Sequence, residues 1–292
     1  MTEPRLLDVQ CLAAGTLHRM AYWEWGDPEN PRVVVCVHGL SRQGRDFDTL
    51  ARALCDEFRV VCPDVAGRGR SQWLADPSAY AVPTYVADMV TLLGRLRADE
   101  LQWVGTSMGG LIGIGLAALA DAPVRRLVLN DVGPAIEYAA LERIGQYLGV
   151  AAHWQSIDEA ADALWAISST FGPHTREQWL ELTRPQVVAD AARGGYRPHY
   201  DPAIAIPFRA VTPALAAAGE AVLWHLYDAI RCPTLLLRGA QSDLLAPATA
   251  AAMSDRGPRA RLHEIAGVGH APTLVQADQV RVVCDFLREH LA

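Results

Sequence analysis

Residues 103–113 read WVGTSMGGLIG: a short apolar segment, a serine between glycines, and the start of a second apolar segment. The residues LQWVGT (101–106) are typical of a short buried strand, and MGGLIGIGLAALA (108–120) is typical of a helix rich in small residues. Ser107 therefore lies at a sharp turn from strand to helix. Such a turn crowds the helix against the strand, and Gly105 and Gly109 leave the room that this crossing needs.

A turn of this kind holds the Ser107 hydroxyl out at the carboxyl end of the sheet, where open α/β folds bind ligands. The backbone N–H of Met108 then lies at a helix N-terminus, positioned to donate to a developing oxyanion. A serine hydroxyl is a weak nucleophile unless a base lies within hydrogen-bond reach and an acceptor orients that base. The rest of the chain must therefore supply a base and an acid.

Candidate partners for Ser107 follow the later strand-like segments. His270 lies in EIAGVGHAPT, where a Gly-rich loop can carry an imidazole over the sheet edge. Asp243 lies in LLLRGAQSDLLAP, after the penultimate predicted strand, and is the expected acid. Asp131, in LNDVGP, is an alternative acid because it follows the preceding strand; we expect it instead to order the chain beyond that strand. The order Ser107, Asp243, His270 is nucleophile, acid, base.

A second oxyanion donor is expected from the loop that follows RVVVCVHG (32–39). The amide of Leu40 is the natural candidate because it comes directly after that strand-like run. His38 and Gly39 are expected to hold this loop in place rather than to react.

Four arginines stand in loops near the expected site. Arg42 and Arg45 lie just past the oxyanion position, and Arg68 and Arg70 lie in AGRGRS. Each pair either binds an acidic substrate or orders a surface loop. We expect loop ordering for Arg68 and Arg70, and the first pair carries the same two alternatives.

Strand-like and helix-like segments alternate over residues 1–133 and 230–292. The predicted strands are 18–26, 32–39, 58–64, 101–106, 124–131, 232–239 and 260–267, and the predicted helices include 46–58, 84–99 and 274–291. This alternation predicts an α/β fold with a mostly parallel sheet covered by helices on both faces. Residues 134–229 show helical periodicity, no convincing strand and many aromatic residues, which predicts an inserted helical cap.

Composition narrows the function class. The formal net charge is −7, and no Lys/Arg stripe is interleaved with aromatics, so nucleic-acid binding is not expected. The longest apolar run, LIGIGLAALA, is too short to span a bilayer, and the N-terminus lacks a signal-peptide layout. The six cysteines are scattered singly, with no CxxC. We expect a cytoplasmic protein without a metal, a cofactor or disulfides.

The chain resembles α/β-hydrolase fold enzymes of the esterase and lipase type that carry a helical cap. The resemblance covers essentially the whole length, through VCVHGL, PDVAGRGRS, VGTSMGG, LVLNDVGP, LLLRGAQSDLLAP and GVGHAP. It implies that Ser107, Asp243 and His270 form a triad, with the oxyanion hole built by Leu40 and Met108. It further implies hydrolysis of a small-molecule carboxylic ester through an acyl-enzyme.

Other activities of the same fold stay open at this stage. Carbon–carbon bond hydrolases, lactonases and cofactor-free perhydrolases share the serine triad. The carbon–carbon bond hydrolases commonly carry an aromatic residue directly after the triad histidine, where this chain has Ala271. A ligand-binding receptor or scaffold that kept the fold is the non-enzymatic alternative, and an intact triad argues against it. No oligomeric state is predicted.

Overall fold

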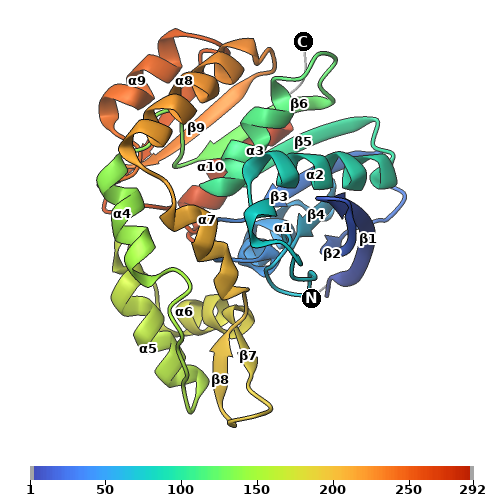
Figure 1. The fold of residues 1–292 in the computed structure, drawn as a ribbon. Helices are drawn as coiled ribbons and strands as arrows, with labels where there is room; N and C mark the ends of the chain where they lie inside the picture. Colours follow the sequence, from blue (N-terminus) through green and yellow to red (C-terminus); the bar gives the residue numbers. More distant parts are fainter. Residues whose placement is uncertain (1–2, 290–292) are drawn as a thin grey trace.

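The computed structural model describes residues 3–289 and is built around one eight-stranded sheet (Figure 1). The strands lie in the order β1-β2-β4-β3-β5-β6-β9-β10. Their bounds are β1 Arg5–Ala13, β2 Thr16–Trp25, β3 Arg32–Val37, β4 Arg59–Pro63, β5 Glu100–Thr106, β6 Val124–Asn130, β9 Thr234–Gly239 and β10 Arg261–Ile265. The pairs β1/β2 and β2/β4 are antiparallel and the other neighbours are parallel. The predicted α/β class is confirmed.

The first strand is absent from the sequence-based prediction. β1 pairs with β2 along its whole length, from Arg5 opposite Glu24 to Ala13 opposite Thr16. It lies at the edge of the sheet, and most of its side chains are exposed or half-buried. An edge strand lacks the continuous apolar pattern of a strand buried on both faces, so its sequence gives little signal.

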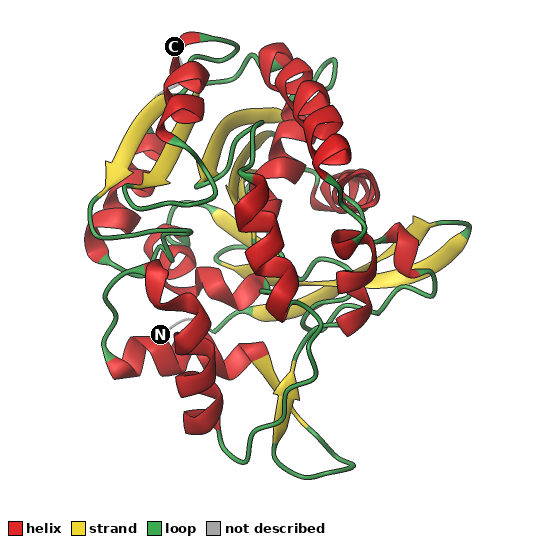
Figure 2. Cartoon of the chain, turned by 60° about the vertical axis from the view of Figure 1, so that its left-hand side comes forward, coloured by secondary structure: helices red, strands yellow, loops and turns green. Residues whose placement is uncertain are grey.

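Helices cover both faces of the sheet (Figure 2). Helices α1 (Asp48–Leu54) and α10 (Ala277–Arg288) share one apolar cluster with the sheet, and α2 (Val82–Leu96), α3 (Met108–Ala117) and α9 (Pro247–Asp255) share the other. Helix α3 is buried almost all round. The β-branched runs of the central strands fit this arrangement, because both of their faces are covered.

The segment between β6 and β9 stands beside the sheet and is mostly helical (Figure 1). Its helices are α4 (Tyr138–Tyr147), α5 (Ile157–Ser168), α6 (Arg176–Thr183), α7 (Ala205–Arg209) and α8 (Pro213–Ala229), and α8 contacts α3. The expectation of no strand here is wrong. Strands β7 (Val187–Ala189) and β8 (Tyr196–Pro198) form an antiparallel hairpin whose turn uses two glycines with positive φ. Three-residue strands are too short to show a sequence period.

Short 3₁₀ helices complete the chain. They are η1 Gly44–Phe47, η2 Pro77–Ala79, η3 Ser169–Phe171, η4 Arg184–Gln186 and η5 Pro202–Ile204. All six cysteines are free thiols. Within residues 3–289 no single helix is long and apolar enough to cross a membrane. One bent pair of helical segments, Pro202–Arg209 and Pro213–Ala229, has the length and composition of a membrane span when the two are taken together.

Candidate active site

Ser107 stands at the junction of β5 and α3 in a strained backbone conformation. Its φ is 50° and its ψ is −117°, values that a non-glycine residue rarely adopts. The neighbouring glycines make this turn possible by close approach. A Cβ built on Gly105 would lie 2.3 Å from the Gly109 carbonyl oxygen, and one on Gly109 would lie 2.0 Å from that of Val37. Helix and strand therefore cross at a separation that only glycine permits at these positions.

The Ser107 hydroxyl belongs to an unbroken chain of hydrogen bonds. His270, in the loop after β10, places Nε2 3.0 Å from the Ser107 Oγ. Its Nδ1 lies 2.7 Å from Oδ2 of Asp131. The Asp131 side chain is fully buried, and that of His270 is 11% exposed. The arrangement is that of a serine nucleophile, a base in contact with it, and an acid that orients the base.

The expectation that Asp243 partners His270 is wrong. Asp243 is exposed and binds Arg143 instead, with Nε to Oδ2 at 2.8 Å and Nη2 to Oδ1 at 3.0 Å. The cause is the turn that precedes it. The Ser242 hydroxyl donates to Asp131 Oδ2 at 2.7 Å and accepts from the amides of Leu244 and Leu245. This turn folds inward at Ser242, so the next carboxylate points away from His270.

Asp131 is held by its own strand and by the next one. It directly follows β6, and its amide donates to the Leu237 carbonyl at 2.8 Å. Its Oδ1 accepts from the Gly239 amide at 2.9 Å, and its Oδ2 takes the Ser242 and His270 hydrogen bonds. Chain order could not identify this residue, because Asp131 and Asp243 both fall between Ser107 and His270. Its place at the end of an apolar strand was the available signal.

The amides of Leu40 and Met108, the expected oxyanion donors, have no acceptor of their own in the described residues. Leu40 follows β3 in the chain and Met108 is the first residue of α3. Neither amide donates a hydrogen bond to another group in the described part of the chain. The first N–H groups of a helix have no intrahelical acceptor and are free to bind an anion.

His38 orders the loop that carries Leu40. The Val65 amide donates to its Nε2 at 3.0 Å, and its Nδ1–H donates to the Gly39 carbonyl at 2.7 Å. These partners assign the tautomer, since one nitrogen must accept and the other donate. Burial lowers the pKa of His38 to about 3, so the ring is neutral near pH 7. The ring is thus a fixed part of the loop.

Arg68 is fully buried and contacts both residues that are expected to supply the oxyanion donors. Its Nε donates to the Leu40 carbonyl at 2.8 Å, and its Nη2 lies 3.5 Å from the Met108 sulfur. Its Nη1 donates to the Ala66 carbonyl and to the Tyr85 hydroxyl. This guanidinium orders the loop and is not free for substrate.

The other three arginines are placed differently. Arg42 binds Asp46 through two hydrogen bonds of 2.6 and 2.8 Å. Arg45 binds Asp48. Arg70 donates from its backbone amide to Asp64 at 2.8 Å.

Ser107 and His270 open into a cavity of about 330 Å³ beneath the helical segment 134–229. Its wall is mainly apolar and includes Tyr147, Val150, Trp154, Leu164, Ile167 and Phe171. Two arginines, Arg42 and Arg143, also line it. Trp165 and Trp179 instead pack edge to face, 5.0 Å apart, inside the helical segment. The volume is at the lower end of small-molecule sites, which span roughly 300–1,000 Å³.

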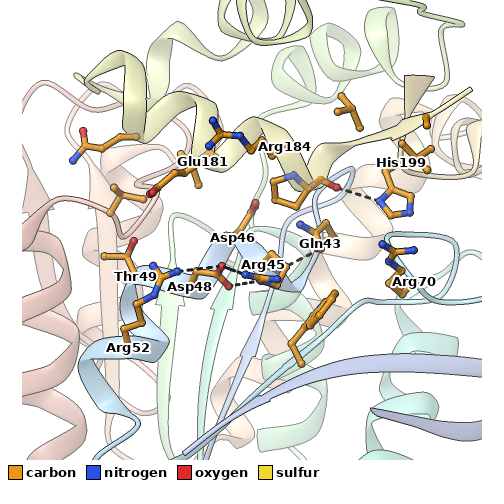
Figure 3. Close-up of a pocket in the computed structure, with 18 residues that line it drawn as sticks. Gln43, Arg45, Asp46, Asp48, Thr49, Arg52, Arg70, Glu181, Arg184 and His199 are labelled. Atoms are coloured by element: carbon orange, nitrogen blue, oxygen red, sulfur yellow. Dashed lines mark hydrogen bonds and ion pairs between the residues drawn. The ribbon is translucent and has the colours of Figure 1, made fainter. Parts of the chain in front are cut away.

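A larger cavity of about 580 Å³ contains neither Ser107 nor His270 (Figure 3). It lies between η1–α1 and the α6–η4 segment, and Figure 3 shows Arg45 bonded to Asp48 within the η1–α1 side of the cavity. Asp46 lines this cavity and accepts from Arg42 and Gln186, which line the first. This hydrogen-bonded group therefore stands between the two cavities.

The fold brings together one group of potential metal-ligating residues that sequence spacing did not indicate. Cys11, His18 and Asp88 are buried within 4.8 Å of one another. His18 Nε2 lies 2.9 Å from Asp88 Oδ2, and the Cys11 thiol donates to the Asp88 carbonyl. Burial and the neighbouring Asp88 raise the pKa of Cys11 to about 12, so it is a thiol rather than a thiolate.

Comparison with known proteins agrees with this geometry. A model of the alpha/beta hydrolase family matches residues 34–283, and the chain belongs to that family. It is 55% identical over 288 residues to a 3-hydroxybutyrate-oligomer hydrolase from Cupriavidus necator, with 97% of this chain and 98% of the relative covered. It is 28% identical to an esterase from Mycobacterium tuberculosis, with 97% and 89% covered.

Solved structures show the same fold. A putative hydrolase from Rickettsia typhi superposes with a TM-score of 0.88 at 30% identity, covering 99% of this chain and 100% of that one. An α/β hydrolase from Novosphingobium aromaticivorans has a TM-score of 0.86 at 34% identity, with 98% and 99% covered. The prediction of a carboxylic ester hydrolase is confirmed, and this chain is an enzyme of that class.

Proposed function

We propose that this enzyme hydrolyses short oligomers of 3-hydroxybutyrate, with Ser107 as the nucleophile, His270 as base and acid, and Asp131 as the residue that orients His270. The hydrogen-bond chain from Asp131 through His270 to Ser107 carries the chemical part of the proposal. The relative that is 55% identical over nearly the whole length supports the substrate. The segment 134–229 is proposed as the cap that shapes the pocket.

The first half of the reaction forms an acyl-enzyme. The Ser107 Oγ attacks the ester carbonyl carbon while its proton passes to Nε2 of His270. The Leu40 and Met108 amides bind the oxyanion, and losing one such donor typically costs about 10²–10³ in rate. His270 then returns the proton to the leaving alkoxide oxygen, so the carbon–oxygen bond breaks and an alcohol departs.

Water completes the reaction. His270 Nε2 takes a proton from a water molecule, whose oxygen attacks the acyl carbon, and the same oxyanion donors act again. Collapse of this second intermediate returns the proton to Ser107 Oγ. The products are two shorter 3-hydroxybutyrate chains, one with a new carboxylate and one with a new hydroxyl group.

The cavity supports this substrate class. An oligoester of 3-hydroxybutyrate carries methyl groups along its length, and these suit the apolar side chains around Ser107. Its free end is a carboxylate, which is ionised near pH 7. Among the described residues that line the cavity, two are arginines and none is acidic, so the wall presents guanidinium groups, each paired with an aspartate outside the wall, to that end.

The test is release of 3-hydroxybutyrate from a linear trimer by wild type, Ser107→Ala and the control Ser254→Ala. The control makes the same change in α9, where Ser254 donates only to the Ala250 carbonyl. We expect Ser107→Ala to lose a factor of about 10³ or more and the control to lose little. Near-normal release by Ser107→Ala would refute the nucleophile. A wild type that cleaves p-nitrophenyl butyrate but not the trimer would refute the substrate.

A further inference from the structure

The pair formed by Arg143 and Asp243 joins two parts of the molecule beside the catalytic pocket. Arg143 lies on α4, and Asp243 lies in the loop after β9. The Arg143 guanidinium donates two hydrogen bonds, of 2.8 and 3.0 Å, to the Asp243 carboxylate. The side chains are 39% and 48% exposed. An ion pair this open to solvent contributes only about 0.2–1 kcal/mol, so it separates easily.

Arg143 is also part of the wall of the cavity that holds Ser107 and His270. Arg42 is the other cation of that wall, but it is committed to Asp46. Both members of that pair are about 15% exposed, and Asp46 also accepts from Gln186. Separating Arg42 from Asp46 would leave the poorly solvated Asp46 carboxylate without its cation, which costs free energy. Arg143 is therefore the cation of this cavity that can change partners.

We propose that Arg143 binds the free carboxylate of the substrate, in exchange for Asp243. This inference rests on the proposed function, since a 3-hydroxybutyrate oligomer ends in a carboxylate. Asp243 shows that a carboxylate fits this guanidinium in the two-pronged geometry that arginine prefers. On exchange, Asp243 turns to solvent, where its charge is hydrated. Arg143 then selects oligomers with an unblocked acid end.

A purely structural pair predicts a different response to mutation. If the pair only fastened α4 to the loop after β9, removing either partner would loosen the same contact and change catalysis in the same direction. If Arg143 binds substrate, Asp243 is its competitor. Removing the arginine then weakens selection for the acid, and removing the aspartate strengthens it.

The experiment compares kcat/KM for the linear 3-hydroxybutyrate trimer with kcat/KM for its methyl ester. The two substrates differ by one negative charge, so their ratio cancels general losses of folding or cap closure. It is measured for wild type, Arg143→Met, Asp243→Asn and the control Arg176→Met. Arg176 is a similarly exposed arginine of the same helical segment, paired with Asp158 and Asp162 and outside the cavity wall.

We expect wild type to favour the acid and Arg143→Met to lower the ratio by about five- to tenfold, as loss of a half-exposed charged contact should. Asp243→Asn should raise the ratio by about two- to fivefold, because it removes the competing carboxylate. The control should leave the ratio unchanged.

An Arg143→Met ratio equal to that of wild type would overturn the inference while leaving oligoester hydrolysis intact. A ratio that Asp243→Asn lowers, as Arg143→Met does, would also overturn it, since removing a competing carboxylate cannot weaken selection for the acid. If wild type cleaves p-nitrophenyl butyrate but neither trimer, the proposed substrate is wrong and the inference falls with it.

Discussion

Replacing Asp131 by asparagine tests which carboxylate serves His270. Asp131 accepts three hydrogen bonds, from the Gly239 amide, the Ser242 hydroxyl and Nδ1–H of His270. Asparagine has one acceptor oxygen and one donor group at the same two positions. If its oxygen stays on Gly239, its NH₂ faces His270 Nδ1. The imidazole must then carry its proton on Nε2, where it can no longer accept the Ser107 proton.

The expected loss in kcat for Asp131→Asn is about 10⁴, which is the typical effect of fixing the wrong tautomer. That factor corresponds to about 5.4 kcal/mol of transition-state stabilisation. Asp243→Asn removes one exposed ion pair worth about 0.2–1 kcal/mol, so its loss should stay below about fivefold. The two substitutions are chemically identical, and the gap between their effects reports position alone.

The assay is kcat for p-nitrophenyl butyrate, with the rate of Ser107 labelling by a fluorophosphonate as a second readout. Thermal unfolding of both variants serves as the control for folding. Equal losses in the two folded variants, or a larger loss in Asp243→Asn, would refute the assignment of Asp131.

The remaining predictions concern acid stability and the nucleophile turn. Burial lowers the pKa of His38 to about 3, so the unfolded chain binds one more proton than the native chain between about pH 3 and 6.5. His38 therefore costs stability as pH falls through this window, and His38→Asn should flatten the acid limb of urea-unfolding curves by about 1.4 kcal/mol per pH unit. Burial raises the pKa of Asp64 to about 6, which makes stability rise as pH falls, but this effect is the same in wild type and in His38→Asn. Equal slopes of unfolding free energy against pH in the two proteins would contradict the reasoning. Gly109→Ala should abolish soluble folded protein, because its Cβ would meet the Val37 carbonyl, whereas Gly94→Ala, with nothing within 4 Å, should stabilise α2 by about 0.5–1 kcal/mol in thermal melts. A folded Gly109→Ala enzyme would show that the strand–helix crossing is looser than described.

Local pattern was enough to predict the turn at Ser107 and the loop that carries His270. A strand, a serine between glycines and a small-residue helix describe one continuous turn, and Ser107 stands at that turn in the structure. The central strands were predictable for a similar reason, because runs buried on both faces are continuously apolar. Edge strand β1 and the β7/β8 hairpin have no such pattern, and the sequence-based prediction misses them.

The sequence itself determined the family and the fold class, and it predicted that Ser107 and His270 belong to one site, because each motif is a short run of residues close along the chain. Only the tertiary structure decided between two acids. Asp131 and Asp243 follow neighbouring strands and stand in the same chain order relative to Ser107 and His270. The inward turn at Ser242, bonded to Asp131, sends the Asp243 carboxylate to Arg143 and leaves Asp131 facing the imidazole. That choice depends on hydrogen bonds between strands more than a hundred residues apart, and no local sequence pattern contains them.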